Sequence, residues 1–378
     1  MKQLTLFDQI PTLLAGKPTP WNSGSNPQPL LLPAAKPIPG RHCESSAIMN
    51  ALNYLGYPIE ECLITGAGGA LGFGFARGTF PFMSARNGDM REQFFVAAGI
   101  PWQKSADRLA ENADFGWQQI AGLLAQGLPV VLRVDMRYLP YLYGGRYGPA
   151  YSSFGWHMIC LFGIDWVRQV ALVSDTAKPG LQEIALKDLH KARGSKLKVM
   201  PPEGEFYWIT GKAETYEPDW QALLLHSLRL VTGYYESASL AALEHYGQDL
   251  VELESYSKPA FLLPAVLQYM AGNIEDFGTG GAAFRMLYRD FLALIAERLK
   301  ATAPLAAQLA KTIASLDECI TGWHEMSAAC RSLGSRIKSM NRAIRAAEYQ
   351  KLKTIADTIY KKERLFYTEL KTCLQELQ

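Results

Sequence analysis

The sequence predicts an α+β domain followed by an all-helical domain, and two observations indicate this division. Four short runs rich in branched and aromatic residues are typical of strands, and they cover residues 130–134, 156–164, 170–173 and 206–209. From residue 220 onward, long segments have helical spacing with little strand signal. Because 378 residues exceed what one core needs, we expect an extended arm (1–39), an α+β domain (40–213) and a helical domain (214–378).

The N-terminal arm is rich in proline and small polar residues, which is why it is expected to be extended. A helix is expected directly after the arm, because apolar residues then recur on one helical face. These residues are Ala47, Ile48, Ala51, Leu52 and Leu55, and Gly56 follows them as a terminator. The pattern therefore places Cys43 at or just before a helix N-terminus.

Residues 66–88 contain seven glycines with interleaved phenylalanines, a pattern too irregular for a helix or a strand. We expect a loop or hairpin here, either as a connector packed by its aromatic rings or as a lid that faces substrate. A further helix is expected at 115–126, where four apolar residues share one face. These are Trp117, Ile120, Ala121 and Leu124.

The composition limits the class of protein. The 38 basic and 36 acidic side chains give a net charge of +2, which removes the general electrostatic case for binding nucleic acid or membranes. No stretch approaches the roughly 18–20 apolar residues that span a bilayer, and the first 32 residues carry five prolines in place of a signal-peptide core. We therefore expect a soluble cytoplasmic protein.

Six cysteines lie at positions 43, 62, 160, 319, 330 and 373, with no CxxC pair and no histidine pair of zinc-site type. A structural metal is therefore not expected. A nucleotide cofactor is not expected either, because the chain lacks a GxxxxGK[ST] loop and a strand–GxGxxG–helix unit. Cys62 and Cys160 lie in apolar surroundings and are expected to be buried free thiols, whereas Cys43 is the exception.

Cys43, His157 and Asp175 have the residue types and positions that a cysteine nucleophile requires. The positive end of a helix dipole favours a thiolate at Cys43, and the first backbone amides can hold an oxyanion. His157 begins one predicted strand and Asp175, 18 residues later, ends the next. An antiparallel pair with a turn at 163–168 would join a base to its orienting carboxylate, in the order seen in papain-like folds. The alternative is that Cys43 and His157 are ordinary core residues.

Several segments of the chain carry a family resemblance. The stretch GRHCESSA at 40–47, with 99–100, 127–131, 156–158 and 174–175, resembles the N-terminal domain of the butirosin-biosynthesis acyltransferase family. That family is similar to the bacteriocin-processing cysteine peptidases. The stretch GGAAFRMLYRDFL at 280–292 resembles the helical domain commonly appended to it. The resemblance implies a papain-like cysteine-enzyme domain followed by an all-helical C-terminal domain.

The same resemblance implies an activity. An acyl group would pass from the phosphopantetheine thioester of an acyl carrier protein to an amine, in bacterial secondary metabolism, with no cofactor besides that of the carrier. Cys43 would carry the acyl group, His157 would act as the base, and Asp175 would orient it. The peptidases also place a glutamine shortly before the cysteine as an oxyanion donor, whereas Lys-Pro-Ile stands here at 36–38. The second oxyanion donor is therefore unassigned, and peptidase activity is not expected.

Four further residues are predicted to contact substrate. His42 and Glu44 flank the nucleophile and match the family motif. Tyr151 and Trp156 belong to an aromatic segment before His157 that is expected to shape the acyl pocket. Each has a structural alternative: a loop hydrogen bond for His42, a favourable first-turn charge for Glu44, and surface packing for the two aromatic residues.

Residues 331–364 carry ten basic and three acidic side chains, a local charge of +7. Because carrier proteins are generally acidic, Arg342, Arg345 and Lys353 are predicted to form a docking face, with a solvated helix face as the alternative. A small-molecule acceptor and a homo-oligomer formed through the helical domain are the other expected partners. Two other functions stay open: a thioesterase, amidase or cyclase with the same three residues, and a non-catalytic protein that holds a carrier-bound chain.

Overall fold

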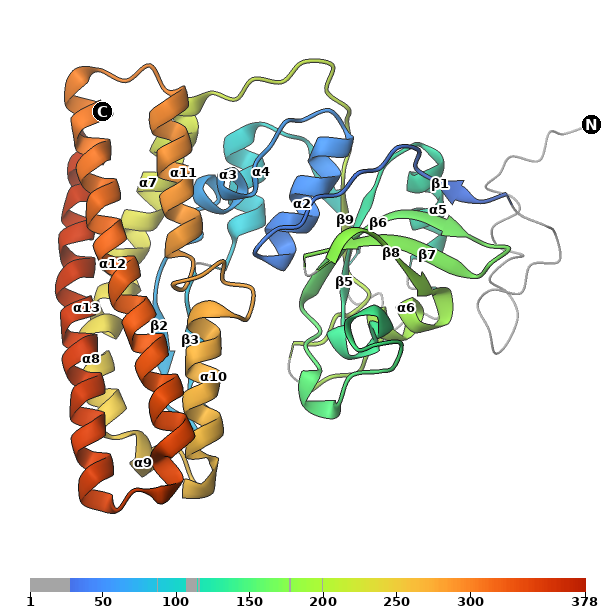
Figure 1. The fold of residues 1–378 in the computed structure, drawn as a ribbon. Coiled ribbons are helices and arrows are strands. Elements are labelled where there is room, and N and C mark those ends of the chain that lie inside the picture. Colours follow the sequence, from blue (N-terminus) through green and yellow to red (C-terminus); the bar gives the residue numbers. More distant parts are fainter. Residues whose placement is uncertain (1–27, 87, 107–113, 115, 177, 199) are drawn as a thin grey trace, which may run out of the picture. The chain divides into compact units, whose positions relative to one another are not determined.

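The computed structural model describes residues 28–86, 88–106, 114, 116–176, 178–198 and 200–378. They form two compact units that do not follow the order of the sequence (Figure 1). Unit 1 comprises the described residues up to Glu60 and those of Ile100–Tyr216, and unit 2 comprises those of Glu61–Gly99 and Glu217–Gln378. The sequence predicts one continuous α+β domain from 40 to 213, but the structure places residues 61–99 in the largely helical unit.

Unit 1 is built on a seven-stranded antiparallel sheet in the order β4-β9-β5-β6-β7-β8, and β1 also pairs with β6. The strands are β1 (Leu30–Leu31), β4 (Trp102–Lys104), β5 (Val130–Val134), β6 (His157–Asp165), β7 (Val170–Asp175), β8 (Lys178–Ala185) and β9 (Phe206–Ile209). Its helices are α2 (Cys43–Tyr54), α5 (Trp117–Ala125) and α6 (Leu186–Arg193), with short 3-10 turns η2 (Met136–Tyr138), η3 (Pro140–Leu142) and η4 (Ala150–Ser152). The four predicted strands correspond to β5, β6, β7 and β9, and the two predicted helices to α2 and α5, so the α+β prediction is confirmed.

Strand β6 lies at the centre of unit 1. All nine of its residues are buried, and both α2 and α5 pack against it, as expected for a strand covered on both faces. The sequence predicts a turn at 163–168, but β6 continues to Asp165 and the turn lies between β6 and β7 at 166–169. Glycine fits at 163 because β1 lies close to β6 there: a Cβ would be 2.8 Å from Leu31 Cδ2 and 2.9 Å from the Leu30 carbonyl oxygen.

Unit 2 is largely helical, as predicted. Its longer helices are α3 (Glu61–Ala67), α4 (Met90–Ala98), α7 (Trp220–Tyr234), α8 (Leu240–Val251), α10 (Leu263–Glu275), α11 (Arg285–Arg298), α12 (Ala303–Arg336) and α13 (Arg342–Glu376). Shorter turns are the π-helix η5 (Tyr235–Ser239), α9 (Leu253–Tyr256), η6 (Ala260–Leu262) and η7 (Ile337–Ser339). A hairpin of β2 (Gly74–Ala76) and β3 (Phe82–Ser84) lies in the glycine-rich segment, so the unit is not entirely helical. Among the described residues, no helix combines the length and apolar character needed to cross a membrane.

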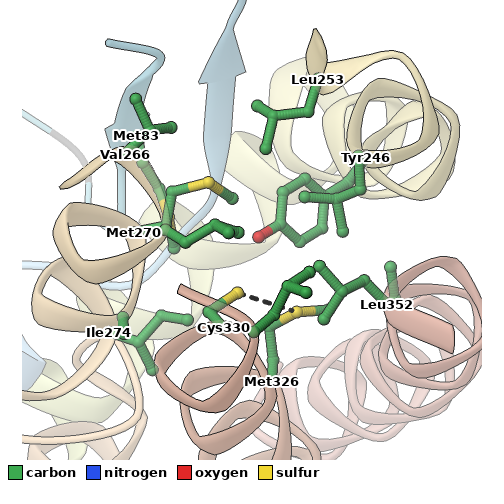
Figure 2. Packing of buried hydrophobic residues seen from close by; sticks show 14 of the residues in the cluster. Met83, Tyr246, Leu253, Val266, Met270, Ile274, Met326, Cys330 and Leu352 are labelled. Carbon is green, nitrogen blue, oxygen red and sulfur yellow. Dashed lines mark hydrogen bonds between the residues drawn. The ribbon is translucent and has the colours of Figure 1, made fainter. Parts of the chain in front are cut away.

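The core of unit 2 explains why residues 61–99 belong to it. Helices α12 and α13 pack along each other and against α8 and α10, burying Trp323 and Ile359 among other apolar residues. Phe73 and Met83, from the glycine-rich segment, are buried in the same cluster. Figure 2 shows Met83 among its neighbours there. The apolar face of α13 is part of this unit's interior. Its buried members are Leu352, Ile359, Phe366, Leu370 and Cys373.

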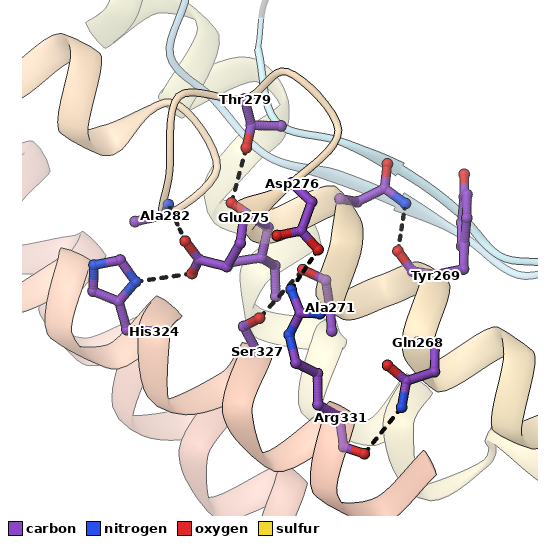
Figure 3. A network of polar contacts seen from close by, with 12 residues as sticks. Gln268, Tyr269, Ala271, Glu275, Asp276, Thr279, Ala282, His324, Ser327 and Arg331 are labelled. Carbon is purple, nitrogen blue, oxygen red and sulfur yellow. Dashed lines mark hydrogen bonds and ion pairs between the residues drawn. The ribbon is translucent and has the colours of Figure 1, made fainter. Parts of the chain in front are cut away.

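Polar contacts hold the end of α10 against α12 (Figure 3). Glu275 accepts hydrogen bonds from His324 at 2.8 Å and from the Ala282 amide at 3.3 Å. Arg331 reaches Asp276 at 2.5 Å. These contacts fix the glycine-containing turn that leads into α11.

A fully buried ion pair crosses the interior of unit 2. Arg285 Nε lies 2.8 Å from Glu363 Oε1, and both side chains are completely inaccessible to solvent. The same carboxylate accepts hydrogen bonds from Trp323 at 2.7 Å and Tyr235 at 2.6 Å. Arg285 also donates to the Gly72 carbonyl at 3.2 Å, which ties the glycine-rich segment to α11 and α13. Such hydrogen bonds offset the cost of burying two charges.

Candidate active site

Cys43 is the first residue of α2, and its position is fixed from both sides. His42 caps the helix: its backbone is extended, its Nδ1 accepts a hydrogen bond from the Ser45 amide at 3.3 Å, and its carbonyl accepts one from the Ser46 amide at 2.9 Å. The Asn50 side chain makes two hydrogen bonds to the backbone of Ile38, at 2.9 and 3.0 Å. The chain that enters the helix is therefore tied to the helix itself.

His157 and Asp175 come together because β6 and β7 are antiparallel neighbours. Cys160 pairs with Ser174, and continuing that register places Asp175 beside Ile159, on the same face as His157 and two residues along. Nε2 of His157 lies 3.0 Å from each carboxylate oxygen of Asp175. Both side chains are buried. The predicted pairing of these two residues is therefore present in the structure.

The electrostatic surroundings keep His157 positively charged. Burial lowers the pKa of this imidazole, but the charge of Asp175 and its hydrogen bond raise it, as do a hydrogen bond and charge at Cys43, and the result is a pKa of about 10. His157 thus has a hydrogen bond to Asp175 and an electrostatic interaction with Cys43.

Cys43 differs from the other cysteines in its accessibility. It is half-buried, whereas Cys62, Cys160, Cys319, Cys330 and Cys373 are buried. Burial raises the pKa of the Cys160 thiol well above its ordinary value, which disfavours its reactive thiolate form. The predicted packing roles of Cys62 and Cys160 agree with their burial, and Cys43 is the thiol that reagents should reach first.

Tyr141 is a site residue that the sequence did not single out. Its hydroxyl donates a hydrogen bond to Asp175 Oδ2 at 2.9 Å. It lies in η3, within the tyrosine-rich segment that was expected to shape an acyl pocket, and nothing in the spacing of that segment indicates which tyrosine faces the carboxylate. In the sequence, only its position in the aromatic segment before His157 indicated that it could lie near the site.

The other predicted substrate residues have varied surroundings. His42 is buried and uses Nδ1 in the helix cap, and Glu44 is buried in the first turn of α2. Tyr151 is 91% exposed. Trp156 lies against the Arg133 guanidinium, 5.2 Å from it, and Arg133 in turn pairs with Glu205 at 2.9 Å. Substrate binding by these residues stays a prediction.

The predicted docking residues lie on α13 in unit 2. Arg345 is paired with Glu254 and Lys353 with Asp357, each at 2.6 Å, while Arg342 is exposed at the start of the helix. Several other basic side chains of residues 331–364 also have carboxylate partners. They are Arg331, Arg336, Lys351 and Lys362. The charge of this stretch is therefore partly neutralised in space.

Two family models match the chain, one after the other. Residues 42–176 match the butirosin biosynthesis protein H N-terminal domain, and residues 187–370 match a domain of unknown function (DUF4872). The chain therefore carries a butirosin biosynthesis protein H N-terminal domain followed by a DUF4872 domain. The butirosin biosynthesis protein H domain contains Cys43, His157 and Asp175, whereas the DUF4872 domain contains the buried Arg285–Glu363 pair. A search of the curated proteins found no match.

The described part of this butirosin biosynthesis protein H domain and of the DUF4872 domain contains no group of three or more histidine, cysteine, aspartate or glutamate side chains able to hold a metal ion.

Proposed function

We propose that this protein is a cysteine-dependent acyltransferase in which Cys43 carries the acyl group. The observation that supports this function is the arrangement of His157, which is hydrogen-bonded to Asp175 and interacts electrostatically with Cys43 at the start of α2. A partly accessible thiol beside a charged imidazole at a helix N-terminus has the features of an activated nucleophile. The match to a domain named for butirosin biosynthesis supports a role in the biosynthesis of a natural product.

The first half-reaction would transfer the acyl group from a carrier-protein thioester to the enzyme. The Cys43 sulfur, with its proton held by His157, attacks the thioester carbonyl carbon and forms a new carbon–sulfur bond. When the tetrahedral intermediate collapses, the bond to the phosphopantetheine sulfur breaks, and this sulfur leaves as a thiol with the proton from His157. Exchange between two thioesters is nearly balanced in energy, so positioning and charge stabilisation are the main requirements.

The second half-reaction would deliver the acyl group to an amine. Neutral His157 now accepts a proton from the amine as its nitrogen attacks the acyl-Cys43 carbonyl, and the Cys43 sulfur leaves. Asp175 keeps Nε2 protonated and Nδ1 directed at the reaction throughout. The products are an amide and a free carrier thiol.

We assign the Cys43 backbone amide as one oxyanion donor. The first N–H groups of a helix have no partner within the helix and point along its positive dipole end. The cap already uses the Ser45 and Ser46 amides, which bond to His42. The Cys43 amide is directly attached to the nucleophile and therefore lies close to any carbonyl that the sulfur attacks.

The donor we propose is an acidic carrier protein that docks on Arg342, Arg345 and Lys353. Exposed ion pairs contribute little stability, so Arg345 and Lys353 can exchange their carboxylate partners for those of a docking protein. Reversing all three to Glu should slow acylation by the carrier protein and leave acylation by a small thioester unchanged. Equal loss with both donors would contradict docking at this surface.

Intact-protein mass spectrometry tests the proposed function. Wild-type protein is mixed with candidate acyl-carrier proteins, and the acyl mass should appear on the wild type but not on Cys43→Ala. Cys62→Ala is the matched control, because it removes a buried thiol and should still acquire the acyl mass. Acyl transfer by Cys43→Ala at the wild-type rate would reject the proposal.

The acceptor separates the proposal from its alternatives. Amide formation that depends on added amine supports acyl transfer, whereas release of a free acid at the same rate with and without amine identifies a thioesterase. A cyclic product identifies a cyclase. A stable complex with acyl carrier protein in which the thioester stays intact identifies a non-catalytic binding protein.

A further inference from the structure

Asp175 accepts hydrogen bonds from two sides. His157 Nε2 is 3.0 Å from both carboxylate oxygens, and Tyr141 Oη is 2.9 Å from Oδ2. The Asp175 side chain has no exposed surface. A buried carboxylate needs its hydrogen-bond partners, because an unsatisfied charged oxygen is costly in a low-dielectric interior.

The Tyr141 hydroxyl is a permanent donor. Burial raises its pKa well above the ordinary value of 10, and the charge of Asp175 and the hydrogen bond to it raise it further. The hydroxyl therefore stays protonated at any pH where the enzyme would work. It can give a proton to a hydrogen bond with Asp175 but does not compete with His157 for one.

The segment that carries Tyr141 is held at both ends by another buried carboxylate. Asp135 accepts hydrogen bonds from the Arg137 and Phe154 amides, each at 3.1 Å, and from the Ser195 hydroxyl at 2.7 Å. The Met136 amide also donates to the Phe154 carbonyl at 3.1 Å. The two ends of the segment 135–154 are thereby joined, which fixes the base of the loop.

A second set of contacts holds the same segment against α6. Tyr147 donates to Asp188 at 2.5 Å. The Lys191 ammonium lies 4.7 Å from the Tyr138 ring and 4.6 Å from the Tyr147 ring, within the range of cation–π attraction. Tyr138 and Tyr147 therefore anchor the segment, and Tyr141 is the tyrosine that reaches the site.

We propose that Tyr141 is a positioning residue that holds the Asp175 carboxylate in the orientation His157 requires. This inference rests on the proposed use of His157 by Cys43. Both carboxylate oxygens of Asp175 lie 3.0 Å from Nε2, so the carboxylate can rotate about its Cβ–Cγ bond without losing this contact. The hydrogen bond from Tyr141 to Oδ2 restricts this rotation. A second donor also lowers the affinity of Asp175 for the Nε2 proton, so the proton stays on His157.

Tyr141→Phe removes the donor and keeps the ring, and Tyr147→Phe is the matched control. Both changes remove one hydroxyl bonded to a carboxylate in the same segment, but only the first affects Asp175. In Tyr141→Phe we expect about a tenfold loss of kcat for acylation with KM for the thioester unchanged, because a hydrogen bond to a charged group is lost away from the substrate. Tyr147→Phe should keep the wild-type kcat.

Proton NMR of the His157 Nε2–H supplies a readout that a merely structural tyrosine would not change. This signal should move downfield in Tyr141→Phe, because Asp175 then gives less of its charge to a second donor, and stay in place in Tyr147→Phe. Alkylation of Cys43 by iodoacetamide, which needs no acyl donor, should slow in the first variant alone. An unchanged Nε2–H signal and unchanged alkylation in Tyr141→Phe would overturn the inference.

These readouts separate the two proposals. If thioesters fail to acylate the wild type while the NMR signal and alkylation still respond to Tyr141→Phe, the acyltransferase proposal fails and the positioning role stands. If the wild type is acylated and Tyr141→Phe matches it in kcat, alkylation and NMR, the positioning role fails alone. If Tyr147→Phe gives the same changes as Tyr141→Phe, the effect comes from the loop as a whole and the positioning role also fails.

Discussion

Replacing Asp175 by Asn tests whether this carboxylate keeps His157 positively charged. Burial lowers the pKa of His157 from its ordinary 6.5, and Asp175 is the first of the groups that raise it to about 10. The net rise, about 3.5 units, corresponds to about 5 kcal/mol in favour of the charged form. Asn keeps the shape without the charge, so only the interactions with Cys43 still oppose the effect of burial, and the pKa of His157 should fall well below 10. At pH 7.5 the imidazole is about 99% protonated at a pKa of about 10, and this protonated fraction should fall in the variant.

NMR of protein labelled at the histidine ring carbons measures this change directly. His190 is an internal reference, because burial and the nearby Arg193 lower its pKa to about 4, and the Asp175→Asn change should leave it there. Acylation of Cys43 should slow by about 100-fold or more, the range expected when a proton-transfer group loses its support. A His157 that stays protonated at pH 8 in Asp175→Asn would refute the electrostatic reasoning.

The same shift predicts how stability depends on pH. A group whose pKa is raised on folding binds a proton more tightly in the folded state, so its contribution is complete below its unfolded pKa. For His157 this contribution should be full below pH 6.5 and should disappear as the pH rises to about 10. The thermal midpoint of wild-type unit 1 should therefore fall across this interval more than that of Asp175→Asn. Equal slopes would contradict the raised pKa.

Two further predictions concern the scaffold. Glu363→Ala leaves the Arg285 charge buried without its partner, so it should lower the free energy of unfolding of unit 2 by about 3–5 kcal/mol in denaturant titrations. Arg289→Ala removes an exposed ion pair and should lower it by less than about 1 kcal/mol. Similar losses in the two variants would contradict the role of burial. Gly163→Ala introduces a Cβ 2.8–2.9 Å from atoms of β1 and should loosen the pairing of β1 with β6. The Leu32 amide donates to the Phe162 carbonyl at 2.9 Å, so its hydrogen exchange should become faster. An unchanged exchange rate would contradict the close approach.

The elements that the sequence predicts are those with a strong internal pattern. Strands β5, β6, β7 and β9 are short apolar runs because they lie within the sheet and are mostly buried. Strand β8 was missed because it is the last strand of the sheet order, where half-exposed positions tolerate Pro179, Gly180 and polar residues. Helix α3 was missed because Gly66 lies inside it, in close contact with Phe291.

The division into units could not be predicted from sequence order. The segment 61–99 lies between two parts of unit 1, and its composition only indicates a glycine-rich connector. What places it in unit 2 is long-range packing. Phe73 is buried in the core of unit 2, its amide donates to Ser239 Oγ at 3.0 Å, and the Gly72 carbonyl accepts from Arg285. Contacts between residues over a hundred positions apart leave no periodic signal.

Some residues of the candidate site could be predicted from local sequence and others could not. Cys43, His157 and Asp175 each lie at the end of an element, and element ends can be predicted from local sequence, so their meeting follows from strand pairing. Tyr141 lies in a loop, where the direction of a side chain depends on tertiary contacts such as those of Asp135. The charge of residues 331–364 also depends on tertiary contacts, because partners such as Glu254 come from other helices.

The two motifs that carry the family resemblance have different physical roles. The motif around Cys43 builds a capped helix start, where we propose that the reaction takes place. The motif at 280–284 builds a left-handed turn, in which even Ala282, Ala283 and Phe284 have positive φ angles of 46°, 52° and 71°. Such angles cost of order 1 kcal/mol or more for each non-glycine residue, so the turn requires compensation.

Arg285 supplies that compensation. It follows the turn directly, donates to the Ala283 carbonyl at 2.7 Å and to Glu363 at 2.8 Å, and is wholly buried. The strained turn and the buried ion pair therefore stabilise one conformation together. The resemblance in the helical half is evidence about folding, and the case for catalysis rests on the residues around Cys43 alone.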